Sequence, residues 1–108
     1  MENKFTFKEY KFPNGETIKC TVAFVLLLKL RENNKKLYEV VNDGLLNGVK
    51  DLVTSAEVLY GAYLCACYAG ENGGIEAVIP KDEFIGKLDD DLVDVYTLCI
   101  SLIHKKKN

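Results

Sequence analysis

The residues best suited to chemistry are four cysteines, Cys20, Cys65, Cys67 and Cys99, and a single histidine, His104. An even number of cysteines suggests disulfides in a small secreted chain, but the N-terminus lacks the basic and apolar segments of a secretory signal. We therefore expect buried free thiols that act as small hydrophobic groups. On a helix, Cys65 and Cys67 would point ~200° apart, so they could neither bridge each other nor chelate one metal ion.

A second candidate for chemistry is the acidic run Asp89, Asp90 and Asp91, followed by Asp94. An EF-hand loop starting at Asp89 needs a glycine at its sixth position and a glutamate at its twelfth, and this sequence has an aspartate and an isoleucine there. Acids at the start of a helix, stabilised by the helix dipole, explain the run better. Nucleophilic catalysis needs a base near a Ser or Cys, and His104 lies beside a basic terminus. The sequence therefore predicts no catalytic residue, no metal site and no cofactor.

Length and charge argue against several classes of partner. The chain has 108 residues, which is the size of one domain. Its 14 basic and 16 acidic residues give a net charge of -2, which provides no basic surface for the phosphates of a nucleic acid. The longest stretch without a charge, residues 58–70, is 13 residues long, whereas a membrane span needs ~20. We expect neither nucleic acid nor a membrane as a partner.

Residues 4–22 are predicted to form a β-hairpin. Phe5 and Phe7 alternate with polar residues, and so do Ile18 and Cys20, which is the period of half-buried strands. An Asn-Gly pair between them tolerates the positive φ angles of a tight turn.

Helices are predicted over residues 22–104. The first covers about 22–32 with Thr21 as its N-cap, although a buried strand continuing through Val25 fits the same apolar run. The second covers about 35–46 and ends at an Asn-Gly pair.

The third helix has the clearest start and stop signals. Thr54 and Glu57 have the spacing of a capping box, and Gly70 is placed to end the helix in the left-handed conformation. Between them, residues 58–69 are apolar on every face, so we expect this helix at the centre of the fold.

Two more helices complete the prediction. A short one follows Pro80, and the last covers about 90–104, leaving residues 105–108 as a basic tail. The expected fold is mainly α, with about five helices and an N-terminal β-hairpin in a single small α+β domain over residues 1–108.

The order of several features points to a family. A strand pair surrounds the sequence FPNGE at 12–16, the sequence LYGAYLCA occupies 59–66, and an Asp-Glu-Phe turn ends at Phe84 before a terminal amphipathic helix. This order resembles the small tail assembly chaperones of long-tailed bacteriophages and prophages, which often carry a Leu-Tyr-Ala-Ala-Tyr-like helix before a Glu-Glu-Phe turn. Gly61 stands where that motif has alanine. The residues that carry the match, as core or partner-binding candidates, are Leu59, Tyr60, Ala62, Tyr63 and Phe84.

The resemblance implies a role without catalysis. Such chaperones bind the long tape measure protein in the host bacterial cytoplasm, self-associate, and are absent from the mature virion. A longer frameshifted form carries a second domain and contacts the tail tube protein. The tape measure protein is helical with apolar stripes, which a small domain with a hydrophobic groove can cover reversibly. Adenine-rich codons at Lys105, Lys106 and Lys107 would be the slippery site for the frameshift.

Two other functions fit the same residues. The first is a small helical regulatory or host-interaction adaptor that binds a folded partner. The second is a thiol-dependent enzyme that uses Cys65 or Cys67, which would require an exposed, reactive thiol.

Overall fold

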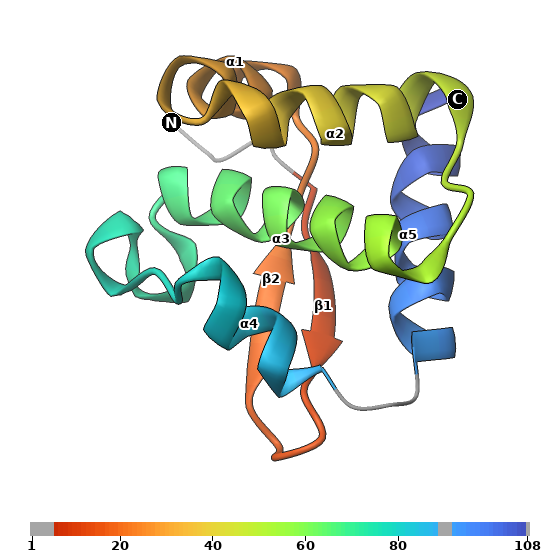
Figure 1. The fold of residues 1–108 in the computed structure, drawn as a ribbon. Coiled ribbons are helices and arrows are strands. Elements are labelled where there is room, and N and C mark those ends of the chain that lie inside the picture. Colours follow the sequence, from red (N-terminus) through yellow and green to blue (C-terminus); the bar gives the residue numbers. More distant parts are fainter. Residues whose placement is uncertain (1–5, 89–91, 108) are drawn as a thin grey trace.

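The computed structural model describes residues 6–88 and 92–107, without the side chains of residues 92–94 and 103–107. It confirms a mainly α fold with an N-terminal β-hairpin in one small domain (Figure 1). The elements are β1 (Lys8–Lys11), β2 (Thr17–Cys20), α1 (Phe24–Asn33), α2 (Lys35–Asn47), α3 (Leu52–Tyr68), the 3₁₀ turns η1 (Glu71–Gly73) and η2 (Ile75–Ala77), α4 (Lys81–Lys87) and α5 (Leu92–Lys107).

The hairpin turns where the Asn-Gly pair predicted. β1 and β2 are antiparallel, and Gly15 has a φ of +100°, which a side chain would disfavour. The residues of β1 and its turn that enter the core are Tyr10 and Phe12. Phe7 precedes the strand and is only half-buried, and Phe5 lies outside the described residues. The aromatic side chains that anchor the hairpin in the core are therefore Tyr10 and Phe12, five residues after Phe5 and Phe7.

Helix α3 is the central element, as its lack of charge predicted. Every residue from 55 to 67 is buried except Glu57. In Figure 1, α3 crosses the middle of the molecule, with α1 and α2 on one side and the hairpin and α4 on the other. It contacts all four other helices and β2, so its apolar surface is covered by protein on all sides.

Both predicted N-caps are wrong. Helix α1 begins at Phe24, so its N-cap is Ala23, and no side chain caps it. The N–H group of Thr21 donates to the carbonyl of Ala62 at 3.1 Å, which ties the end of the hairpin to α3. Helix α3 begins earlier than the predicted capping box. The N-cap is Asp51, whose carboxylate accepts a hydrogen bond from the N–H group of Thr54 at 2.7 Å. Thr54 therefore lies in the first turn of α3 and is not its N-cap.

The remaining helix limits follow the sequence more closely. Val25 belongs to α1, which excludes a strand continuing through it. Gly48 and Gly70 follow α2 and α3 with φ of +85° and +89°, as their positions predicted. Pro80 is the N-cap of α4 and lies just before its first turn.

The last helix, α5, continues to Lys107, beyond its predicted end near His104, so the basic residues before Asn108 belong to the helix. Its predicted acidic start at Asp89, Asp90 and Asp91 lies outside the described residues. The buried side of α5 is formed by Val95, Cys99 and Leu102.

Helices α2 and α3 approach each other closely at two glycines. A Cβ atom at Gly61 would overlap the Cγ2 atom of Val41, and one at Gly44 would lie 3.1 Å from Cγ2 of Val58. Gly61 therefore has a packing role at the crossing of the two helices, which explains why alanine does not fit there.

The glycine-rich segment after α3 is ordered by one side chain. Asn72 adopts the left-handed conformation, with φ 59° and ψ 26°, and its amide pairs with the backbone of Lys19. Oδ1 of Asn72 accepts from the Lys19 N–H at 2.8 Å, and Nδ2 donates to the Lys19 carbonyl at 2.9 Å. These bonds occupy the outer edge of β2 and fix the segment that leads to α4.

Candidate functional site

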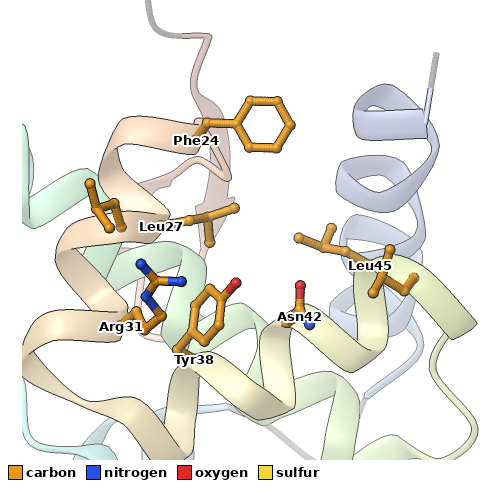
Figure 2. A pocket seen from close by; sticks show the side chains of 8 residues that line it. Phe24, Leu27, Arg31, Tyr38, Asn42 and Leu45 are labelled. Atoms are coloured by element: carbon orange, nitrogen blue, oxygen red, sulfur yellow. The ribbon is translucent and has the colours of Figure 1, made fainter.

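An apolar groove lies between α1 and α2 (Figure 2). Its volume is about 370 Å³, and six of its eight lining residues are aliphatic or aromatic. The lining residues are Phe24, Leu27, Leu28, Arg31, Tyr38, Asn42, Leu45 and Leu46.

The groove exists because α1 is apolar on more faces than the domain covers. Leu26, Leu27 and Leu30 of this helix are buried against the core. Phe24 and Leu28 remain exposed, with 78% and 43% of their surface accessible. Single exposed apolar residues are common on proteins, but a group of them around one concave surface is typical of an interaction site.

Helix α2 supplies the other wall of the groove. Leu37, Val41 and Leu45 of this helix are buried and hold it against the core. Leu46, one position further on, is 65% exposed and faces the groove with Leu45 at its open end. The two helices meet at Asn34, whose side chain caps α2 by accepting from the N–H group of Leu37.

Arg31 and Tyr38 lie beside each other at the narrow end of the groove, near the point where α1 and α2 meet. The Arg31 guanidinium lies over the Tyr38 ring, 5.8 Å from the ring centroid. Figure 2 shows these two side chains together, with Phe24 and Leu45 farther apart at the open end and Asn42 along α2. The groove thus has an apolar open end, and a solvent-exposed cation, Arg31, lies at its narrow end.

The size of the groove suits a short stretch of helix. Phe24 and Arg31 are seven residues apart on α1, which corresponds to about 10.5 Å at 1.5 Å per residue. That length is roughly two turns, over which an amphipathic helix presents apolar side chains at i, i+3 or i+4, and i+7.

The five residues singled out by the resemblance lie together in the interior, away from this groove. Tyr60 and Tyr63 of α3 pack against Phe84 of α4, each with 5.0 Å between ring centroids. Leu59 and Ala62 are fully buried on the same helix. These side chains hold the domain together and are not accessible to a partner in this conformation.

The two tyrosines also fix the chain before α4 through their hydroxyl groups. The Tyr60 hydroxyl donates to the carbonyl of Ile79 at 2.8 Å, and the N–H of Ile79 donates to the Tyr63 hydroxyl at 2.9 Å. Burial raises the pKa of Tyr60, and it raises the pKa of Tyr63 to about 12. Both phenols are therefore neutral hydrogen-bonding groups at neutral pH.

Two ion pairs secure α4 at its ends. Lys81 pairs with Glu57 of α3, and Lys87 pairs with Glu16 of the hairpin turn, each at 2.9 Å. Because these pairs are partly exposed, most of the attachment of α4 comes from the buried Phe84 ring.

A second hollow, of about 340 Å³, lies between the hairpin and the segment before α4. Its main polar side chains are already engaged: Tyr63 with Ile79, Asn72 with Lys19, and Glu16 with Lys87. These side chains are therefore not available to hydrogen-bond a ligand in this hollow.

All four cysteines are buried thiols that form no disulfide. Burial raises the pKa of the Cys20 and Cys67 thiols, and it raises the pKa of Cys99 to about 11. Thiols in this environment react slowly, which is typical of structural cysteines. Among the described residues, no three His, Cys, Asp or Glu side chains gather where they could hold a metal ion.

The residues that line the groove were not predicted from the sequence. The apolar run that contains Phe24 and Leu28 is evident there, and the resemblance implies a hydrophobic groove, but neither indicates which residues line it. The available signal was an apolar helix without a polar face, since such a helix in a small domain must leave some apolar surface uncovered.

Comparison of the chain with protein-family models, with curated proteins and with solved structures found no match. In the part of the chain that is described, none of the helices has the length and apolar character that a membrane span requires.

Proposed function

We propose that this chain is a tail assembly chaperone of a long-tailed bacteriophage or prophage, which binds and shields the tape measure protein without catalysis. The observation that carries the proposal is the apolar groove between α1 and α2. Its exposed residues Phe24, Leu28 and Leu46 could cover an apolar helix of a client. The order of sequence features that resembles the tail assembly chaperones adds support.

The physical basis is reversible burial of apolar surface. Each square ångström of apolar surface removed from water contributes ~25 cal/mol. A contact of only two helical turns buries a small area, and the cost of association offsets part of this gain, so the contact shields a client without holding it permanently. The domain itself depends on α3 and its aromatic contacts, so the groove can be filled and vacated without disturbing the core.

The proposal includes further partners and a place of action. The protein acts in the host bacterial cytoplasm, self-associates, and leaves before the virion is complete. A longer product, made by a frameshift near Lys105, Lys106 and Lys107, contacts the tail tube protein. The nucleotide sequence tests the frameshift directly, because codons that interrupt the adenine run at these lysines contradict it.

Co-expression with the tape measure protein tests the main proposal. We expect the wild-type chain to co-purify with the tape measure protein and to increase its soluble fraction. Leu46→Asp should weaken the complex by at least about tenfold, since burial of a leucine is worth ~1.5–3 kcal/mol and a carboxylate resists burial.

Val53→Asp is the matched control for this experiment. Val53 is 67% exposed, close to the 65% of Leu46, but it lies at the start of α3 and does not line the groove. Thermal unfolding of both variants checks that the fold is retained. Absence of co-purification with wild-type protein contradicts the chaperone proposal and favours the adaptor function. An equal effect of the two substitutions contradicts the placement of the site in the groove.

A further inference from the structure

Arg31, the cation at the narrow end of the groove, has no counterion among the residues that the structure describes. Arg31 is the only charged residue among the eight that line the groove. None of the carboxylates in the described residues forms an ion pair with it, and its neighbour is the uncharged Tyr38 ring. An apolar surface with one unpaired cation is complementary to an apolar surface with one anion.

The surrounding sequence reinforces this charge. The chain as a whole is slightly acidic, with a net charge of -2, yet residues 29–39 carry four basic and two acidic side chains. This segment includes the end of α1 and the start of α2, which meet at the narrow end of the groove. The basic members are Lys29, Arg31, Lys35 and Lys36, and the acidic members are Glu32 and Glu39.

We propose that the groove recognises an amphipathic helix that carries an acidic side chain at one end of its apolar stripe, and that Arg31 binds this side chain. This inference rests on the proposed function, because it specifies the kind of helix that the groove accepts. The apolar side chains of the ligand lie between Phe24, Leu28 and Leu46, and the acidic side chain reaches the narrow end.

The spacing and direction of the ligand follow from the geometry. A ligand helix that runs along α1 covers the distance from Phe24 to Arg31 in about seven residues, so the acid should stand at i+7 from the first apolar residue. The C-terminal end of a helix carries about half a negative charge, which favours placing that end beside Arg31. The acid should therefore follow the apolar stripe in the sequence of the ligand.

Arg31 also lies in the last turn of α1, where a cation stabilises the helix dipole. That role concerns the stability of the domain alone and predicts no preference among ligands. A comparison of ligands that differ in one charge separates the two roles.

Three synthetic helical peptides of roughly 18 residues provide this test, since shorter isolated helices are marginal in water. They share leucines at i and i+4 and carry Glu, Gln or Lys at i+7. We expect fluorescence anisotropy to show the Glu peptide bound about two- to fivefold more tightly than the Gln peptide, as for a partly exposed ion pair, and the Lys peptide bound more weakly. The difference should shrink at high salt.

Substitutions in the protein complete the test. Arg31→Glu should reverse the preference, so that the Lys peptide binds best, and Arg31→Gln should remove it. Lys29→Glu makes the same change in charge on the same helix, at an exposed position outside the groove. Because Lys29 belongs to the basic segment but does not line the groove, this substitution should reduce the preference for the Glu peptide only slightly and keep the order of the peptides. Thermal unfolding of each variant separates an effect on binding from an effect on stability.

The possible outcomes distinguish this inference from the proposed function. Equal binding of the three peptides, or an equal effect of Lys29→Glu and Arg31→Glu, overturns the role of Arg31 and leaves the groove as a helix-binding site. Failure of all three peptides to bind contradicts the groove function and the role of Arg31 together. A dimer in sedimentation experiments that Leu46→Asp abolishes would show that a second copy fills the groove, which also overturns the inference.

Discussion

Substitution of Gly61 by alanine tests how tightly the central helix is packed. A Cβ atom at this position would overlap Cγ2 of Val41 on α2, and it would lie 3.6 Å from side-chain atoms of Leu30 and Leu37. Val41 is completely buried, and a valine in a helix has one strongly preferred side-chain rotamer, so its methyl group cannot turn away freely. The added methyl group must push α2 and α3 apart.

The expected magnitude follows from two opposing effects. Overpacking in a well-packed core costs about 1–3 kcal/mol. Replacement of glycine by alanine inside a helix contributes about 0.5–1 kcal/mol in the opposite direction. Because the overlap is with a buried, rigid side chain, the cost of overpacking should exceed the gain from removing glycine. We therefore expect Gly61→Ala to lower the free energy of unfolding by about 1–2 kcal/mol.

Urea unfolding followed by circular dichroism measures this change, with two further variants as comparisons. Gly86→Ala in α4 is the matched control, because a Cβ atom there meets nothing within 4 Å, and we expect it to stabilise the protein. In a double mutant, Val41→Ala should make room for the new methyl group, so the loss should be smaller than the sum of the single losses by about 1 kcal/mol. Stabilisation by Gly61→Ala alone, or additive effects in the double mutant, would refute the close packing of α2 and α3.

Three other predictions concern the tyrosines and the thiols. Tyr63→Phe leaves the Ile79 N–H group without its acceptor and should lower the free energy of unfolding by about 1–3 kcal/mol in urea, while Tyr68→Phe, which removes a half-buried hydroxyl on the same helix, should cost less. Burial raises the pKa of Tyr63 from 10.0 to about 12, so the stability contributed by its neutral phenol is complete below pH 10 and is lost as the pH rises toward 12. Between these pH values, the free energy of unfolding should therefore fall less in Tyr63→Phe than in the wild-type protein. The buried thiols should react slowly with a thiol reagent in the folded protein and quickly in urea, whereas one fast thiol at Cys65 or Cys67 in the folded state would favour the enzyme hypothesis.

Local patterns in the sequence predicted the elements well, because each depends on residues close together in the chain. The Asn-Gly pair gave the hairpin turn, Gly48 and Gly70 gave two helix ends, and the uncharged residues 58–69 gave the central helix. The errors arose where contacts distant in sequence decide the outcome. Thr21 has the residue type of an N-cap, but its backbone is bonded to the carbonyl of Ala62 on another helix, and α1 begins only after Ala23.

The candidate site was less predictable, since exposure is a property of the packed domain. The apolar run of α1 contains Leu27 and Leu30, which are buried, beside Phe24 and Leu28, which are exposed. No local pattern separates these two sets, because the apolar residues surround the helix. The resemblance directed attention to Tyr60 and Tyr63, whose contacts prove to be internal.

We propose that an apolar helix of the tape measure protein binds between α1 and α2. Amide hydrogen exchange of the chain, measured free and in complex with the tape measure protein, would locate this contact. We predict that the complex slows exchange in α1 (Phe24–Asn33) and α2 (Lys35–Asn47) and leaves β1, β2 and α4 nearly unchanged. Protection confined to the hairpin or α4, or a complex that forms without protection of α1 and α2, would contradict it.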